Sequence, residues 1–127
     1  MSHQRSLCMA LSILFLAVAL LSAPAPAKPR LTPQYLFGLW RQTYGPFVTQ
    51  TQLNTDFVFR SITVRPGTSY RLQVTGTWKL EGNMFWMTWV EWYPHTMPKP
   101  LPEGTAVEVI DDNHFRNKLG IVTRVTR

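Results

Sequence analysis

The sequence predicts an all-β domain, an antiparallel meander that forms a β-sandwich or a small β-barrel. Short runs rich in Val, Ile, Thr and aromatic residues are separated by turn residues such as Tyr44-Gly45-Pro46 and Arg65-Pro66-Gly67. One run, residues 70–80, alternates strictly between apolar and polar side chains, which is typical of a strand with one buried face. The 127 residues are enough for one domain.

The N-terminal residues 1–27 have the three-part layout of a secretory signal peptide. A polar start containing Arg5 is followed by the apolar run 7–21 and by small residues that end at Ala27. Because this run is shorter than the roughly 20 apolar residues of a spanning helix, cleavage after Ala27 is favoured over an uncleaved membrane anchor. We expect a periplasmic or secreted protein with no stable membrane span after signal cleavage.

The mature chain contains no cysteine, since Cys8 lies in the signal peptide. A disulfide-free exported domain fits a bacterial periplasm or cell surface. Of the 13 Lys and Arg residues only Arg5 lies in the signal peptide, which leaves 12 against 7 Asp and Glu. These charges are spread singly and are not interleaved with aromatic residues on one face, so a nucleic-acid partner is not favoured.

Residues 28–35 are expected to form a proline-containing leader, and residues 36–127 the barrel domain. A helix is possible only at residues 31–37. Six strands are expected, at residues 36–42, 55–64, 70–80, 84–92, 105–110 and 119–126. The second of these changes its apolar face between Phe59 and Ile62, which predicts a bulge or bend.

The hairpin of residues 70–92 is the best-defined element. Leu72, Val74 and Trp78 are expected to face a core, and Gly76 in the same row indicates a bend or a close crossing. Glu81-Gly82-Asn83 supplies a tight turn. The returning strand carries apolar residues on both faces, and β-branched and aromatic residues favour a strand over a helix there.

Turn and aromatic motifs along this path resemble those of the small bacterial lipocalin-like domains, which are exported and mostly uncharacterised. The motifs are Gly38-Leu39-Trp40, Phe57-Val58-Phe59, Gly67-Thr68, Gly76-Thr77-Trp78, Gly82-Asn83 and Asp111-Asp112-Asn113-His114-Phe115. The resemblance covers residues 36–124 and implies a barrel closed at its base by Trp40. A full lipocalin has eight strands, so six strands imply a barrel that is partial or that a second chain completes.

This reading favours a non-catalytic barrel that binds a small apolar or amphipathic ligand or serves as an envelope module. The residues expected to line its interior, shared between core and pocket, are Trp40, Phe57, Phe59, Tyr70, Leu72, Val74, Trp78 and Trp86.

An alternative function comes from the second face of the strand at residues 84–92. Phe85, Met87 and Trp89 form a row that must be covered by residues 94–102, by a second chain, or by a bound apolar molecule. This row predicts a protein interface, in a homodimer or in an inhibitor of a partner enzyme.

No catalytic or metal-binding arrangement stands out in the sequence. Residues 111–114 (Asp-Asp-Asn-His) occupy a turn, where Asp and Asn are favoured, and the further oxygen ligands of a calcium loop do not follow. His95 and His114 lack a partner at zinc-ligand spacing. Since nucleophile-elbow, phosphate-loop and dinucleotide motifs are also absent, we expect no enzymatic activity, no metal and no cofactor.

Overall fold

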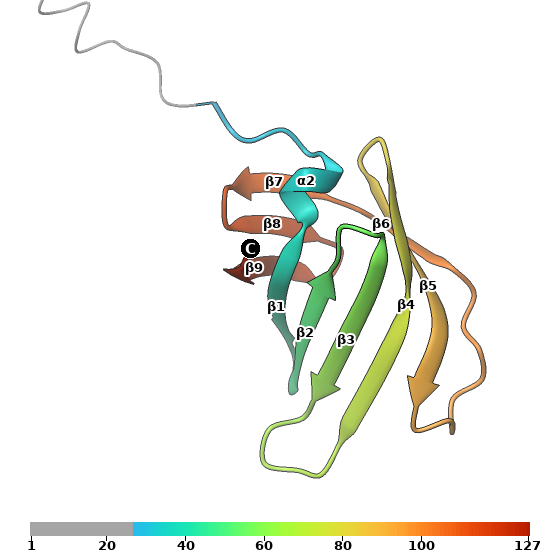
Figure 1. Ribbon diagram of the computed structural model, residues 1–127. Coiled ribbons are helices and arrows are strands. Elements are labelled where there is room, and N and C mark those ends of the chain that lie inside the picture. Colours follow the sequence, from blue (N-terminus) through green and yellow to red (C-terminus); the bar gives the residue numbers. More distant parts are fainter. Residues whose placement is uncertain (1–26) are drawn as a thin grey trace, which may run out of the picture.

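The computed structural model describes residues 27–127, so the predicted signal peptide lies outside the described residues except for Ala27. These residues form a nine-stranded antiparallel sheet rolled into a nearly closed barrel, with the short helix α2 (Pro33–Leu36) at one end (Figure 1). The predicted all-β antiparallel meander is confirmed.

Each strand pairs with its neighbour in the chain, except at one seam. The strands are β1 (Gly38–Tyr44), β2 (Phe47–Leu53), β3 (Val58–Val64), β4 (Arg71–Glu81), β5 (Met84–Tyr93), β6 (Glu103–Ala106), β7 (Glu108–Asp111), β8 (His114–Asn117) and β9 (Gly120–Thr126). The last strand, β9, returns to pair with β1 and brings the two ends of the domain together.

The seam of the barrel lies between β6 and β7, which are two halves of one bent segment. β6 pairs with β5 and β7 pairs with β8, and only Val107 separates them. Val107 is buried, and its backbone N–H donates to the Asn83 carbonyl at 2.9 Å. One chain therefore supplies the nearly closed ring, and no second chain is needed to complete it.

The expected six strands were too few because three elements lack the pattern used to find them. β2 directs Thr49 and Thr51 inward and exposes Gln50, so its two faces do not differ in polarity. β8 is only four residues long. The strand expected at residues 105–110 is divided at Val107.

The apparent bulge in the second predicted strand is absent. β3 keeps regular register with both neighbours from Phe59 to Val64, and Phe57 lies before it with a φ of 64°. The face of the apolar residues changes because Ser61 and Thr63 face the interior. In this part of β3 the polar side chains face the interior and the apolar ones face outward, and the backbone of the strand is regular.

The closed end of the barrel is packed under α2. Leu36, Trp40 and Phe59 are the largest fully buried side chains, and the Trp40 Nε1–H donates to the Leu36 carbonyl at 2.7 Å. Thr32 caps α2 by accepting from the Tyr35 N–H, and Leu31 packs against the core. The folded domain therefore includes part of the predicted leader.

The crossing expected at Gly76 is confirmed. A Cβ atom at this position would lie 2.7 Å from Cε1 of Phe59 and would also collide with the Thr88 carbonyl. Beside it β5 contains a bulge, since Thr75 pairs with Glu91 and Gly76 pairs with Trp89. Because of the extra residue, Trp89 and Trp92 both turn toward the interior.

Candidate ligand-binding cavity

A cavity of about 390 Å³ lies inside the barrel. The β3–β4 and β5–β6 connections lie at the end of the barrel away from α2 (Figure 1). The cavity lining extends to Tyr70, Met97 and Leu119, which are exposed side chains in or beside the connections β3–β4, β5–β6 and β8–β9. Trp40 and Phe59 form its inner limit. The barrel thus has a packed end and an open end.

One wall of the cavity is apolar and comes from β4 and β5. Its side chains are Leu72, Val74, Phe85, Met87 and Trp89. Trp92 packs beside this wall, with its ring centroid 6.2 Å from that of Trp89. Its Nε1–H donates to the Met97 carbonyl at 3.0 Å, which ties the proline-rich β5–β6 connection to the mouth.

The opposite wall is polar and comes from β1, β2, β3 and β8. Its side chains are Gln42, Thr49, Thr51, Ser61, Thr63 and Asn117. The hydroxyls of Thr49 and Thr63 share a hydrogen bond of 2.8 Å, and Thr51 donates to Ser61 at 3.3 Å.

The amide of Gln42 completes this wall by donating to Asn117 Oδ1 at 2.8 Å. Charge is confined to the rim, because Glu103 and Lys118 are the only charged residues among the lining side chains. These two form an ion pair with each other and are both more than half exposed. The interior therefore offers hydrogen bonds without a net charge.

The structure brings together part of the predicted ligand-binding set. Trp40, Phe59, Tyr70, Leu72 and Val74 all line the cavity.

Phe57, Trp78 and Trp86 do not line it. Trp78 is buried against Phe37 and Phe57, with ring centroids 5.8 and 4.9 Å away, outside the cavity lining. Trp86 lies on the outer face of β5, where it covers Gly104 so closely that a Cβ there would be 2.8 Å from the indole ring.

The orientation of β5 is the reverse of the predicted one. Phe85, Met87 and Trp89 were expected at an interface but face the cavity, and Trp86 was expected inside but faces outward. Both rows of this strand are apolar, so hydrophobicity alone does not decide which one faces inward. In the structure Trp86 packs closely against Gly104 of the paired strand β6.

Sequence reasoning missed the polar wall entirely. The signal that could have found Thr49 and Thr51 is their alternation with Gln50 and Gln52, since Thr favours strands even where the face is polar. The same rule applies to Thr63 in β3.

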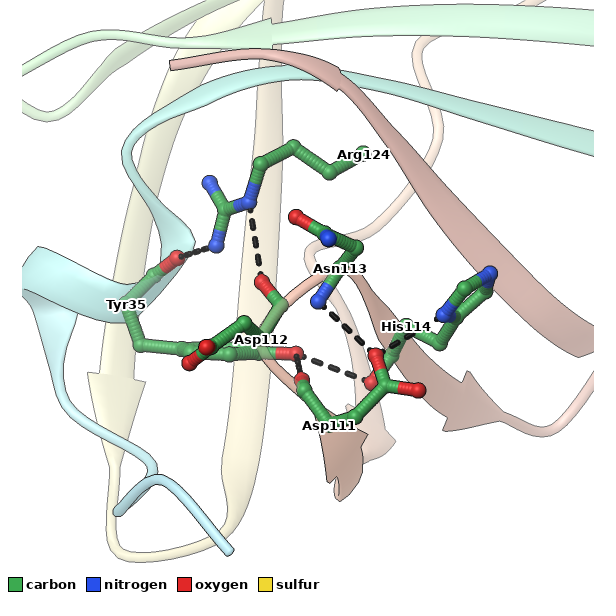
Figure 2. A network of polar contacts seen from close by, with 6 residues as sticks. All are labelled: Tyr35, Asp111, Asp112, Asn113, His114 and Arg124. Atoms are coloured by element: carbon green, nitrogen blue, oxygen red, sulfur yellow. Dashed lines mark hydrogen bonds and ion pairs between the residues drawn. The ribbon is translucent and has the colours of Figure 1, made fainter.

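The closed end is held by a second polar cluster, shown in Figure 2. Arg124 donates to the carbonyls of Tyr35 and Asp112 at 2.7 and 3.0 Å (Figure 2). It also donates to the Phe37 carbonyl at 2.9 Å. Its guanidinium also lies 4.1 Å from the ring centroid of Trp40. Since its acceptors are backbone carbonyls, Arg124 joins α2, the β7–β8 turn and β9.

Tyr35 and the β7–β8 turn complete this cluster. The Tyr35 hydroxyl lies 2.7 and 2.9 Å from the carbonyl oxygens of Asp111 and His114, and burial raises the pKa of Tyr35 to about 12. The Asn113 N–H and the His114 ring, 2.8 Å away, lower the pKa of Asp111. The exposed Asp111–His114 pair thus serves to shape a turn.

Among residues 27–127 no group of three or more His, Cys, Asp or Glu side chains is placed to hold a metal ion. No helix within the described part of the chain is long and apolar enough to cross a membrane. Comparisons with family models, with curated proteins and with solved structures found no match to this chain. The geometry of the cavity therefore carries the functional argument.

Proposed function

We propose that the domain is a non-catalytic carrier or sensor that binds one small amphipathic molecule inside the barrel. The observation that carries this proposal is the cavity of about 390 Å³ with an aromatic wall. Small-molecule sites typically measure about 300–1,000 Å³ and combine apolar walls with a few polar groups. The resemblance to lipocalin-like domains and the signal-peptide pattern lead to the same proposal for an exported protein.

The open interior is what distinguishes a binding barrel from a purely structural one. Met87 and Trp89 are only half-buried and line the cavity. A ligand that covers their apolar surface removes it from water, which gives binding a physical driving force.

A neutral fluorescent dye, N-phenyl-1-naphthylamine, tests the proposal. We expect saturable binding of one dye per chain, with enhanced dye emission as it leaves water. Leu72→Trp fills the cavity and should weaken binding at least about tenfold. Thr77→Trp, on the exposed outer face of the same strand, should bind as the unmodified protein does.

The proposal is wrong if the folded protein shows no saturable binding. It is equally wrong if Thr77→Trp weakens binding as much as Leu72→Trp does, because the dye then binds the outer surface. Near-ultraviolet circular dichroism of each variant verifies that the barrel is folded.

The alternative interface on β5 loses the residues on which it depended. Phe85, Met87 and Trp89 are directed into the cavity, and Phe85 is 9% exposed. On β5 the large hydrophobic side chains that remain exposed are Val90 and Tyr93. The cavity inside the barrel is therefore the site that we propose for binding.

A further inference from the structure

We propose that the ligand is a neutral ring system that carries hydroxyl or carbonyl groups along one edge and is apolar along the other. This inference rests on the proposed function and narrows the class of ligand. The two unlike walls of the cavity carry it.

The strand register places the polar groups side by side. Two rows of cross-strand neighbours run around the wall: Trp40, Thr51, Ser61 and Val74 in one, and Gln42, Thr49, Thr63 and Leu72 in the other. Each row begins on β1 and ends at an apolar residue of β4. β2 and β3 thus present a polar strip that is two layers deep, Gln42 of β1 extends one of the two layers, and β4 and β5 line the cavity with hydrocarbon and aromatic rings.

The hydroxyls of this strip keep hydrogen-bonding capacity for a ligand. A hydroxyl can donate once and accept twice. The bond between Thr49 and Thr63 uses the proton of only one of them. Ser61 accepts from Thr51, and no protein group in the described part of the chain accepts the Ser61 proton.

Ser61 and Thr63 are nevertheless buried, at 8% and 9% exposed. A ligand that enters the cavity displaces water from these groups, so it must replace the lost hydrogen bonds to bind well. A site that hydrogen-bonds its ligand discriminates strongly against an analogue without the polar group.

The charge distribution argues for a neutral molecule. Among residues 27–127, Lys118 is the only cation that lines the cavity, and it lies at the rim in an ion pair with Glu103. A carboxylate inside would find no unpaired cation. A simple hydrocarbon chain would cover the hydroxyls of Thr51 and Ser61 without bonding to them. A two-sided ring system satisfies both walls at once.

Flavone and a trihydroxyflavone with its three hydroxyls along one edge provide a matched pair of probes. Both are measured by displacement of N-phenyl-1-naphthylamine at about pH 5.5, where phenols are neutral. We expect the trihydroxyflavone to bind at least about tenfold more tightly than flavone. The Thr51→Val/Thr63→Val variant should lose this preference, because its affinity for the trihydroxyflavone should fall about tenfold more than its affinity for flavone.

Thr77→Val on the outer face is the matched control and should retain the full preference. Ser61→Ala provides a smaller change that should reduce the preference if the double variant fails to fold. Equal affinity of the native protein for both flavones, or an unchanged preference in the folded cavity variants, would overturn the inference while dye binding upholds the proposed function. If the dye does not bind either, both proposals fail.

Discussion

Arg124 makes several of the contacts that hold the closed end of the barrel together. Its guanidinium binds three backbone carbonyls from two separate segments and covers the face of Trp40. An arginine has a planar fork of donors that a lysine lacks, so a lysine at this position could not make the same set of hydrogen bonds. Arg124 therefore links β9 to α2 through specific hydrogen bonds.

We predict that Arg124→Leu lowers the free energy of unfolding by about 2 kcal/mol, because it leaves carbonyl groups without their donor. Arg124→Lys should recover less than half of this loss. Urea unfolding measures both effects. Arg41→Leu, an exposed arginine on β1, is the control and should change stability by less than about 0.5 kcal/mol. A similar small change for Arg124→Leu would contradict the linking role of Arg124.

Tyr35 makes the stability of the closed end depend on pH in the alkaline range. Its pKa is raised from 10.0 to about 12, because burial disfavours the phenolate. A raised pKa in the folded state means that this stabilisation is complete below pH 10 and is lost as the pH rises toward about 12.

We predict that Tyr35→Phe lowers the free energy of unfolding at pH 7 by about 1 kcal/mol, since the carbonyls of Asp111 and His114 lose a donor. Between pH 10 and 12 the variant should lose less stability than the unmodified protein, so the two curves converge. Unfolding curves collected across this range test the sign. Parallel curves would show that Tyr35 titrates equally in both states.

At the scale of elements, the hairpin of β4 and β5 could be predicted and β2 could not. Leu72 and Val74 alternate with Arg71 and Gln73, so the pattern alone predicts β4 and its buried face. In β2 the inward residues Thr49 and Thr51 are as polar as the outward ones. A method that expects apolar residues inside finds packed cores and misses polar cavity walls.

The same argument explains which half of the candidate site could be found. Trp40, Phe59 and Leu72 were accessible because large apolar side chains on strands usually face inward. For β5 the sequence offers two apolar rows, and the contact of Trp86 with Gly104 and the bulge beside Gly76 accompany the observed choice. Those are tertiary facts that no local pattern contains.

Gly76 is the position where β4 depends most on having no side chain. We predict that Gly76→Ala lowers the free energy of unfolding by about 3 kcal/mol, because its Cβ would press on Phe59 and on the Thr88 carbonyl. Gly82→Ala is the comparison, since Gly82 has a φ of 61° but open space around it, and should cost about 1 kcal/mol.

Thermal or urea unfolding ranks the two glycine variants. The order of the two losses is the decisive result. If Gly82→Ala lowered the free energy of unfolding more, the strain of a positive φ would cost more than the steric contact at Gly76, contrary to this prediction.

For the whole molecule, the barrel is a tube with one fastened end and one open end. α2, Tyr35 and Arg124 close the first, and the connections that carry Tyr70 and Met97 surround the second. The hydrogen bonds of Arg124 and Tyr35 thus lie away from the cavity mouth. Under the proposed function, a ligand would enter at the open end without disturbing these contacts.

Closure of the ring depends on the seam at Val107. This seam leads to a prediction for the oligomeric state of the protein in solution. Because β6 pairs with residues 84–87 of β5 and β7 pairs with β8, the seam needs no strand from a second chain, and we expect a monomer. Val107→Pro removes the N–H that bonds to Asn83 and should lower the free energy of unfolding by about 3 kcal/mol. It should also free the edges of β5 and β8, so sedimentation velocity should show association that increases with concentration.

Leu101→Pro, at an exposed site in the β5–β6 connection, is the control and should neither lower the free energy of unfolding nor cause association. A Val107→Pro protein that remains a monomer of native stability would show that the ring closes elsewhere.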